Sequence, residues 1–160
     1  MKSRITNPAI AVPGAMEAFQ TLGKVAKEAA KNAGVPESTI ELMSFRASQI
    51  NGCAVCLDMH ARGLKKMGES DERLLTLAAW RETPYFTDAE RAALALAEAG
   101  TRLADRSNPV PDEVFNGAAK YYDEAALAAL VMSIAAINAW NRLNVISAQE
   151  TGEWVAQWVG

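Results

Sequence analysis

Apolar residues recur every three or four positions along most of the chain, and no segment alternates apolar and polar residues over the length of a strand. This periodicity is typical of amphipathic helices and predicts an all-α fold. Gly34 and Gly68 follow two of the periodic segments as stop signals, and Pro36 opens another. Thr87 and Glu90 have the spacing of a capping box and predict a further helix start. The predicted helices cover residues 13–32, 36–50, 53–67, 71–80, 87–104, 112–121 and 124–147, with one or two more turns within 150–159.

The most apolar stretch runs from Ala125 to Ile137 and is interrupted only by Ser133. It is too short to span a bilayer, so we interpret it as part of a buried core helix that Asp123 caps. No Gly-, Pro- or Ser-rich linker divides the chain, and 160 residues are enough for one substantial core. We therefore expect a single compact domain over residues 1–160.

Lysine and arginine number 16, aspartate and glutamate 19, and the formal charge is −3. Because no basic cluster is present, the composition argues against a nucleic-acid-binding protein. The basic start of the chain precedes an apolar segment that is too short for a signal-peptide core. We expect a cytoplasmic protein without membrane attachment. In that compartment two cysteines close in sequence more often indicate catalysis or a metal than a structural disulfide.

Both cysteines and the only histidine lie in the run Cys53-Ala54-Val55-Cys56-Leu57-Asp58-Met59-His60. On a helix, Cys53, Cys56 and His60 share one face. Two thiols at this spacing can close a small disulfide, and a histidine one turn further on can exchange a proton with them. The reactive form of cysteine is the thiolate, which free N–H groups and the positive end of the dipole stabilise at a helix start. The motif therefore predicts a redox site with at least one lowered thiol pKa.

Glu41 is the expected third participant in proton transfer. If helices 36–50 and 53–67 form a hairpin about Asn51-Gly52, Glu41 lies about 15 Å before the turn and His60 about 12 Å after it, at roughly 1.5 Å per residue. A carboxylate opposite the histidine would orient the ring and hold its proton. We therefore expect Glu41, His60 and Cys56 to form a proton relay that serves the thiol pair.

Other interpretations of these residues remain open at this point. The thiols and the histidine are also compatible with inert core positions, and Glu41 with a solvated surface carboxylate. Cys53, Cys56, His60 and Glu41 have ligand types that suit zinc, but the second ligand pair typical of structural zinc is missing, and we expect neither metal nor cofactor. Two other functions are also compatible with these residues. One is a redox-sensing oligomer without turnover. A lyase or isomerase that uses His60 and Glu41 on a small lactone or keto acid is another.

The run from Glu41 to His60, with eleven residues between Glu41 and C-x-x-C-x-x-x-H, resembles the core motif of the AhpD-like alkylhydroperoxidase family. This family lies within the carboxymuconolactone decarboxylase superfamily. Residues 80–94 and 138–142 resemble later family segments, so the resemblance covers about residues 35–150. It implies a compact helical bundle of the AhpD-like type with the motif on a helix hairpin. It also implies a homo-oligomer, commonly a trimer or hexamer, that reduces hydroperoxides through its thiols.

The resemblance implies a role for each motif residue. Cys56 attacks a small hydroperoxide and becomes a sulfenic acid, Cys53 resolves it or donates a proton, and His60 and Glu41 form the relay. An external dithiol then restores the thiols. In the best-known members this dithiol is a lipoyl group on a carrier protein, and a peroxiredoxin is the partner. Val55 stands where the best-known member has a histidine, which implies a weaker peroxidase.

Overall fold

The computed structural model describes residues 2–158, and within them the chain forms helices and no strand. The elements are α1 (Pro8–Ala11), α2 (Ala15–Asn32), α3 (Glu37–Asn51), α4 (Ala54–Lys66), α5 (Asp71–Thr76), the 3₁₀ helix η1 (Leu77–Glu82), α6 (Asp88–Thr101), α7 (Asp112–Ala119), α8 (Glu124–Ile146) and α9 (Glu153–Trp158). The all-α prediction is confirmed. The predicted C-terminal turn extended to Val159, which lies outside the described residues.

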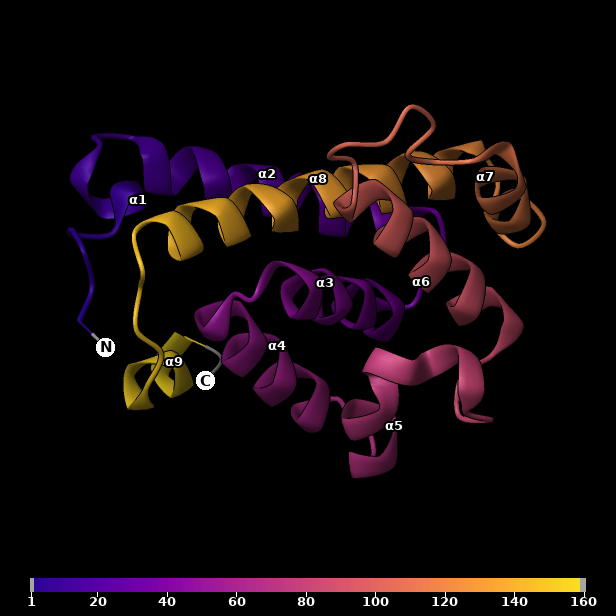
Figure 1. Ribbon diagram of the computed structural model, residues 1–160, viewed down its shortest axis with the longest axis horizontal. Coiled ribbons are helices and arrows are strands. Elements are labelled where there is room, and N and C mark those ends of the chain that lie inside the picture. Colours follow the sequence, from indigo (N-terminus) through magenta and orange to yellow (C-terminus); the bar gives the residue numbers. More distant parts are fainter. Residues whose placement is uncertain (1, 159–160) are drawn as a thin grey trace.

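Helix α3 lies at the centre of the fold. Figure 1 shows α2 and α8 running together along one side of the molecule, with α3 beneath them and α4 beyond it. Ten consecutive residues of α3, from Thr39 to Ser48, are buried, because α4, α6 and α8 all pack against this helix. Polar groups on α3 must therefore find partners inside the fold. Glu41 is one of these buried polar residues.

The predicted hairpin between the two motif helices is confirmed. Gly52 ends α3 with a φ of 68°, in the left-handed region that glycine adopts without strain. Its N–H donates to the carbonyl of Ser48, and the chain then reverses into α4, which packs against α3. The turn thus places the thiols at the start of α4 and brings the later part of α4 back alongside α3.

One local prediction about helices was wrong, and one short helix was not predicted. The segment 71–80 is not one α-helix, because it changes at Leu77 into the 3₁₀ helix η1, with non-helical angles at Ala79. In 3₁₀ geometry residues three apart point the same way, so Leu77 and Trp80 are buried together. The apolar pattern also did not predict the short helix α1, which Asn7 caps and Pro8 opens.

Helix α8 is longer than the apolar run that predicted it. Its 23 residues are long and apolar enough to cross a membrane by length and composition alone, but half of the most apolar window is buried inside the fold. The helix predicted over 124–147 is confirmed to within one residue: the apolar run that ends at Ile137 is only part of α8, which continues through buried asparagines. Its contacts with α2, α3 and α6 make α8 a core helix of this domain.

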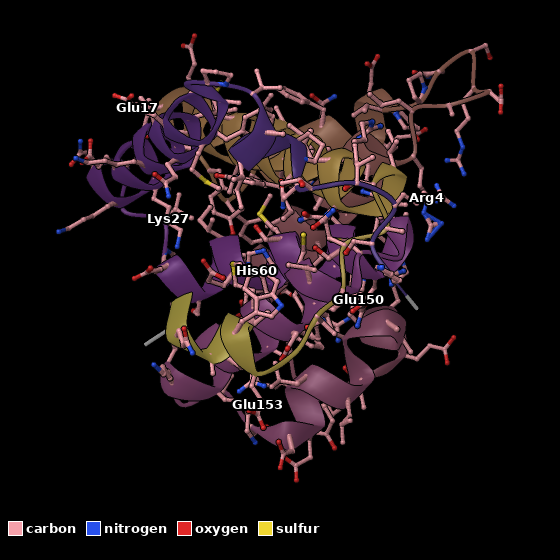
Figure 2. The ribbon with its side chains drawn as sticks, turned by 90° about the vertical axis from the view of Figure 1, so that its left-hand side faces the viewer. Arg4, Glu17, Lys27, His60, Glu150 and Glu153 are labelled. Carbon is pink, nitrogen blue, oxygen red and sulfur yellow. The ribbon has the colours of Figure 1, made fainter. Side chains whose placement is uncertain are left out.

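Helix α9 packs against α4, the helix that carries the motif. Thr151 donates a hydrogen bond to Asp58 at 2.6 Å, and Val155 is fully buried. Figure 2 shows α9 in front of the segment labelled at His60. The C-terminal segment therefore forms part of the surroundings of the motif.

Candidate active site

Cys53 is the N-cap of α4 and not a residue of its first turn, which corrects the sequence-based placement. Its backbone is extended, with φ −86° and ψ 97°, and its Sγ accepts a hydrogen bond from the backbone N–H of Cys56 at 3.3 Å. This is the position where a side-chain anion meets free N–H groups and the positive end of the helix dipole. Both thiols are free and buried, with 1% exposure for Cys53 and 4% for Cys56.

The two thiols have opposite pKa shifts. The hydrogen bond from the Cys56 thiol lowers the pKa of Cys53 to about 7; burial opposes this, and the Cys56 backbone N–H adds to it. The pKa of Cys56 is raised, first by its hydrogen bond to Cys53 and then by burial and by the negative charge on Cys53. The pair therefore loses one proton near neutral pH and keeps the other, because two adjacent negative charges repel each other.

Glu41 and His60 meet across the α3–α4 hairpin, as predicted. Nδ1 of His60 lies 2.6 Å from Oε2 of Glu41, and both side chains are largely buried, at 14% and 7% exposure. Burial would raise the pKa of Glu41, but the hydrogen bond and charge of His60, followed by those of Lys27, lower it to about 2. Glu41 is therefore a carboxylate, and His60 donates its Nδ1–H to it. This arrangement leaves Nε2 as the ring atom that exchanges protons.

The structure brings the predicted residues together in two pairs rather than in one continuous relay. Cys53 contacts Cys56, and Glu41 contacts His60. In the part of the chain that the structure describes, no hydrogen bond joins His60 to either thiol. A proton passing between the pairs must therefore travel through water or through a bound substrate.

Three residues of the site were missed in the sequence. Lys27 of α2 places Nζ 2.7 Å from Oε1 of Glu41. On α8, the amide of Asn144 donates to Sγ of Cys56 at 3.4 Å, and hydrogen bonds from Asn144 and Asn141 lower the pKa of both thiols. The asparagines had a usable signal, because polar residues recur every third position on an otherwise apolar helix. Lys27 had none, because its contact depends on how α2 packs.

The asparagines belong to a buried polar network along α8. Asn51, the last residue of α3, donates to both Asn138 and Asn141 at 2.9 Å. Asn141 donates in turn to the Ser48 hydroxyl at 3.1 Å. These bonds tie the end of α3 to α8 and so fix the turn that positions Cys53.

The four residues considered for zinc do not form a metal site. Within residues 2–158, no group of three or more His, Cys, Asp or Glu side chains is arranged to hold a metal ion. Both oxygens of Glu41 and Nδ1 of His60 are already used in mutual contacts and in the contact with Lys27. The geometry thus favours proton exchange over metal ligation.

A separate buried charge cluster surrounds Glu98. Its carboxylate accepts from Arg46 and Arg81, both at 2.6 Å, and from the indole of Trp80 at 3.2 Å. These bonds fix η1 against α3 and α6. No thiol or histidine takes part, so this cluster serves the fold.

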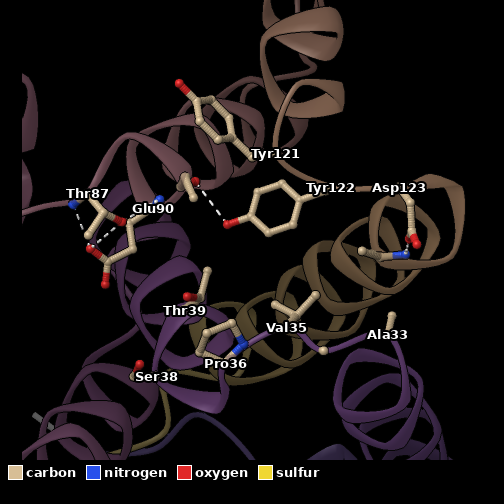
Figure 3. A pocket seen from close by; sticks show the side chains of 13 residues that line it. Ala33, Val35, Pro36, Ser38, Thr39, Thr87, Glu90, Tyr121, Tyr122 and Asp123 are labelled. Atoms are coloured by element: carbon tan, nitrogen blue, oxygen red, sulfur yellow. Dashed lines mark hydrogen bonds between the residues drawn. The ribbon is translucent and has the colours of Figure 1, made fainter.

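A cavity of about 510 Å³ opens at the ends of α2 and α7 and the starts of α3, α6 and α8. Figure 3 shows partners for three of its polar side chains: Tyr122 donates to the carbonyl of Ala89, Glu90 accepts from Thr87, and Asp123 caps α8. None of the predicted site residues lines this cavity. The chemistry of the motif therefore lies elsewhere.

The chain is similar to one protein family and to several individual proteins. The model of the carboxymuconolactone decarboxylase family matches residues 13–99. The match therefore includes α2. The resemblance seen in the sequence covered only about residues 35–150 and did not include this helix. Protein YdfG of Bacillus subtilis is 38% identical over 145 residues, which cover 91% of this chain and 94% of that protein.

Two further similar proteins have AhpD in their names. A crystal structure of ATU0492 from Agrobacterium tumefaciens, a proposed antioxidant defence protein AhpD of unknown function, has a TM-score of 0.83 and 33% identity. The alignment covers 94% of this chain and 99% of the ATU0492 chain. Alkyl hydroperoxide reductase AhpD of Bradyrhizobium diazoefficiens is 44% identical over 45 residues, which are 28% of this chain and 25% of that protein.

Proposed function

The chain belongs to the carboxymuconolactone decarboxylase family, and we propose that it is a thiol-dependent oxidoreductase that reduces small alkyl hydroperoxides or a disulfide on a peroxiredoxin. The observation that supports this most is the N-cap position of Cys53, beside a second thiol and with a pKa of about 7. The pair therefore carries one negative charge at neutral pH, and a proton shift between the two hydrogen-bonded sulfurs gives the Cys56 thiolate that attacks a peroxide or a disulfide. The contact between Glu41 and His60 supplies a nearby group for proton exchange.

The proposed cycle starts from a Cys53 thiolate that accepts a hydrogen bond from the Cys56 thiol. As the hydroperoxide binds, that proton moves to Cys53, and the Cys56 thiolate attacks the terminal oxygen of the peroxide, the one that carries the hydrogen. The O–O bond breaks, Cys56 becomes a sulfenic acid, and the departing alkoxide takes the proton back from Cys53. The low pKa of Cys53 suits this step, because it makes Cys53 a ready proton donor.

The second half of the proposed cycle closes the disulfide. The Cys53 thiolate attacks the sulfur of the Cys56 sulfenic acid, the S–O bond breaks, and protonated His60 gives a proton to the hydroxide, which leaves as water. An external dithiol, such as a lipoyl group on a carrier protein, reduces the disulfide and is itself oxidised to a disulfide. Since this cycle needs reduced thiols between turnovers, we place it in the cytoplasm.

Trapping the sulfenic acid tests the proposed roles. We expect one equivalent of cumene hydroperoxide, in the presence of dimedone, to give an adduct on Cys56 in the Cys53→Ser variant. In the Cys56→Ser variant we expect a much slower reaction at Cys53. An adduct that forms only on Cys53 would reverse the roles. The lyase alternative instead predicts that activity on a small lactone survives Cys53→Ser and needs His60, and a sensor would be oxidised once without turnover.

We also propose that the protein assembles as a homo-oligomer, a trimer or a hexamer. Several large apolar side chains are exposed on the single chain, among them Ile10 at 64%, Leu75 at 83% and Ile146 at 70%. Burying such side chains between subunits would remove apolar surface from water. Light scattering coupled to size-exclusion chromatography measures the mass, and a monomer of 17.2 kDa would contradict this proposal.

A further inference from the structure

Lys27 lies outside the cysteine motif and reaches it from another helix. Its Nζ is 2.7 Å from Oε1 of Glu41 and 3.6 Å from Oε1 of Glu37. The lysine side chain is half exposed, whereas that of Glu41 is only 7% exposed. A surface lysine thus inserts its charge against a buried carboxylate, on the face seen in Figure 2, where Lys27 and His60 are labelled.

The carboxylate of Glu41 divides its two oxygens between a lysine and a histidine. Oε1 faces Lys27, and Oε2 faces His60. Glu37 is the other charged group in contact with this cluster, and it also pairs with Lys27. Within residues 2–158, the other helices packed on α3 (α6, α8 and η1) place no ion-pairing group on Glu41.

These two basic residues differ in one respect that matters for proton transfer. His60 changes its charge when it gives up a proton, whereas Lys27 keeps its charge. Burial would lower the pKa of Lys27, but the charge and hydrogen bond of Glu41 raise it. Without Lys27, each deprotonation of His60 would leave a buried carboxylate with no cation, and burial would then favour a proton on Glu41 itself.

We propose that Lys27 is a positioning residue that keeps Glu41 ionised in both protonation states of His60, so that the mobile proton is carried at Nε2 of His60. Its catalytic consequence rests on the proposed function, but its effect on Glu41 does not. Lys27 contacts neither thiol, so it acts through Glu41 only.

Titration of the Glu41 side chain tests this directly. Carbon-13 NMR of glutamate-labelled protein follows the carboxyl carbons with pH, and the Glu41→Gln variant identifies the Glu41 signal. We expect the midpoint of Glu41 to rise by about 1 to 2 pH units in Lys27→Met and to stay near the wild-type value in Lys27→Arg. Lys24→Met is the matched control, because Lys24 lies on the same helix and only approaches the exposed Glu28 at 3.9 Å.

A second variant separates charge from hydrogen bonding. Lys27→Gln keeps a polar side chain without the charge, and we expect it to shift the Glu41 midpoint as Lys27→Met does. A wild-type midpoint in Lys27→Met or in Lys27→Gln would overturn the proposal, as would an equal shift in Lys24→Met. Circular dichroism at each pH restricts the comparison to folded protein.

An activity measurement then tests the consequence for turnover. We expect the acid limb of the kcat profile for hydroperoxide reduction to move to higher pH in Lys27→Met, with kcat about tenfold lower on that limb, little changed at neutral pH and with KM unchanged, and to recover in Lys27→Arg. A raised Glu41 midpoint with an unchanged kcat profile would remove the catalytic role. If the wild type itself shows no turnover, the proposed function fails, and the Glu41 titration still decides whether Lys27 holds the carboxylate ionised.

Discussion

Glu41→Gln is the substitution whose effect on stability can be worked out most fully from the structure. Glutamine keeps the size of the side chain and removes its charge. The wild-type carboxylate has a pKa of about 2 in the folded protein, against an ordinary value of 4.5, although burial acts in the opposite direction. Folding therefore strengthens the hold on the ionised form, chiefly through His60 and then through Lys27.

The magnitude follows from the difference between the two pKa values. It corresponds to a roughly 300-fold change in proton affinity, or ~3 kcal/mol at neutral pH. Because the folded pKa is the lower one, this stabilisation is fully present above pH 4.5 and is lost as the pH falls from 4.5 towards 2. Total stabilities of single domains are about 5–15 kcal/mol, so the expected loss in Glu41→Gln is measurable.

Urea unfolding followed by circular dichroism at several pH values between about 3 and 8 measures this difference. We expect the free-energy gap between wild type and Glu41→Gln to be constant above about pH 5 and to shrink below it. Glu37→Gln is the matched control. Glu37 lies on the same helix, but its side chain is 63% exposed and its contact with Lys27 is longer, at 3.6 Å. A gap that does not change with pH, or an equal loss in Glu37→Gln, would refute the reasoning.

Three further predictions concern the thiols, the buried charge cluster and the hairpin. The ultraviolet absorbance of thiolate should titrate near pH 7 in the wild type and at higher pH in Cys56→Ala, because Cys53 loses the side-chain hydrogen bond that most lowers its pKa; an unchanged midpoint would contradict this. Glu98→Gln should cost about 3 kcal/mol in unfolding measurements, because it leaves its two arginines without a carboxylate, and it should leave the thiol titration unchanged. Gly52→Ala should destabilise the protein by about 1 kcal/mol because φ is 68°, whereas Gly23→Ala, inside α2 with no atom near the new Cβ, should stabilise it by a similar amount.

Local rules were sufficient to predict part of the site from the sequence. The break at Asn51-Gly52 predicted where α3 ends. Because a helix rises by about 1.5 Å per residue, residue spacing alone gave the distances of Glu41 and His60 from this turn. The fold class followed from apolar periodicity in the same way. Each of these predictions depends on spacing within one or two adjacent helices.

Contacts between distant helices were beyond local rules. Lys27 reaches Glu41 only because of the way α2 packs beside α3, and nothing in the residues around Lys27 indicates that orientation. The segment predicted as an α-helix forms η1 around Trp80. The burial of Trp80 and its hydrogen bond to Glu98 outweigh helix propensity there. The cap position of Cys53 was missed by one residue, within the usual uncertainty of helix ends.

In the proposed function, the Cys53–Cys56 pair turns over in a redox cycle. Steady-state reduction of cumene hydroperoxide with dihydrolipoamide, comparing the wild type with Cys56→Ser, tests it most directly. We expect turnover in the wild type that disappears in the variant, together with a Cys53–Cys56 disulfide that mass spectrometry detects when the dithiol is omitted. No turnover in a wild type whose thiols are verified as reduced, or turnover that survives Cys56→Ser, would contradict the account.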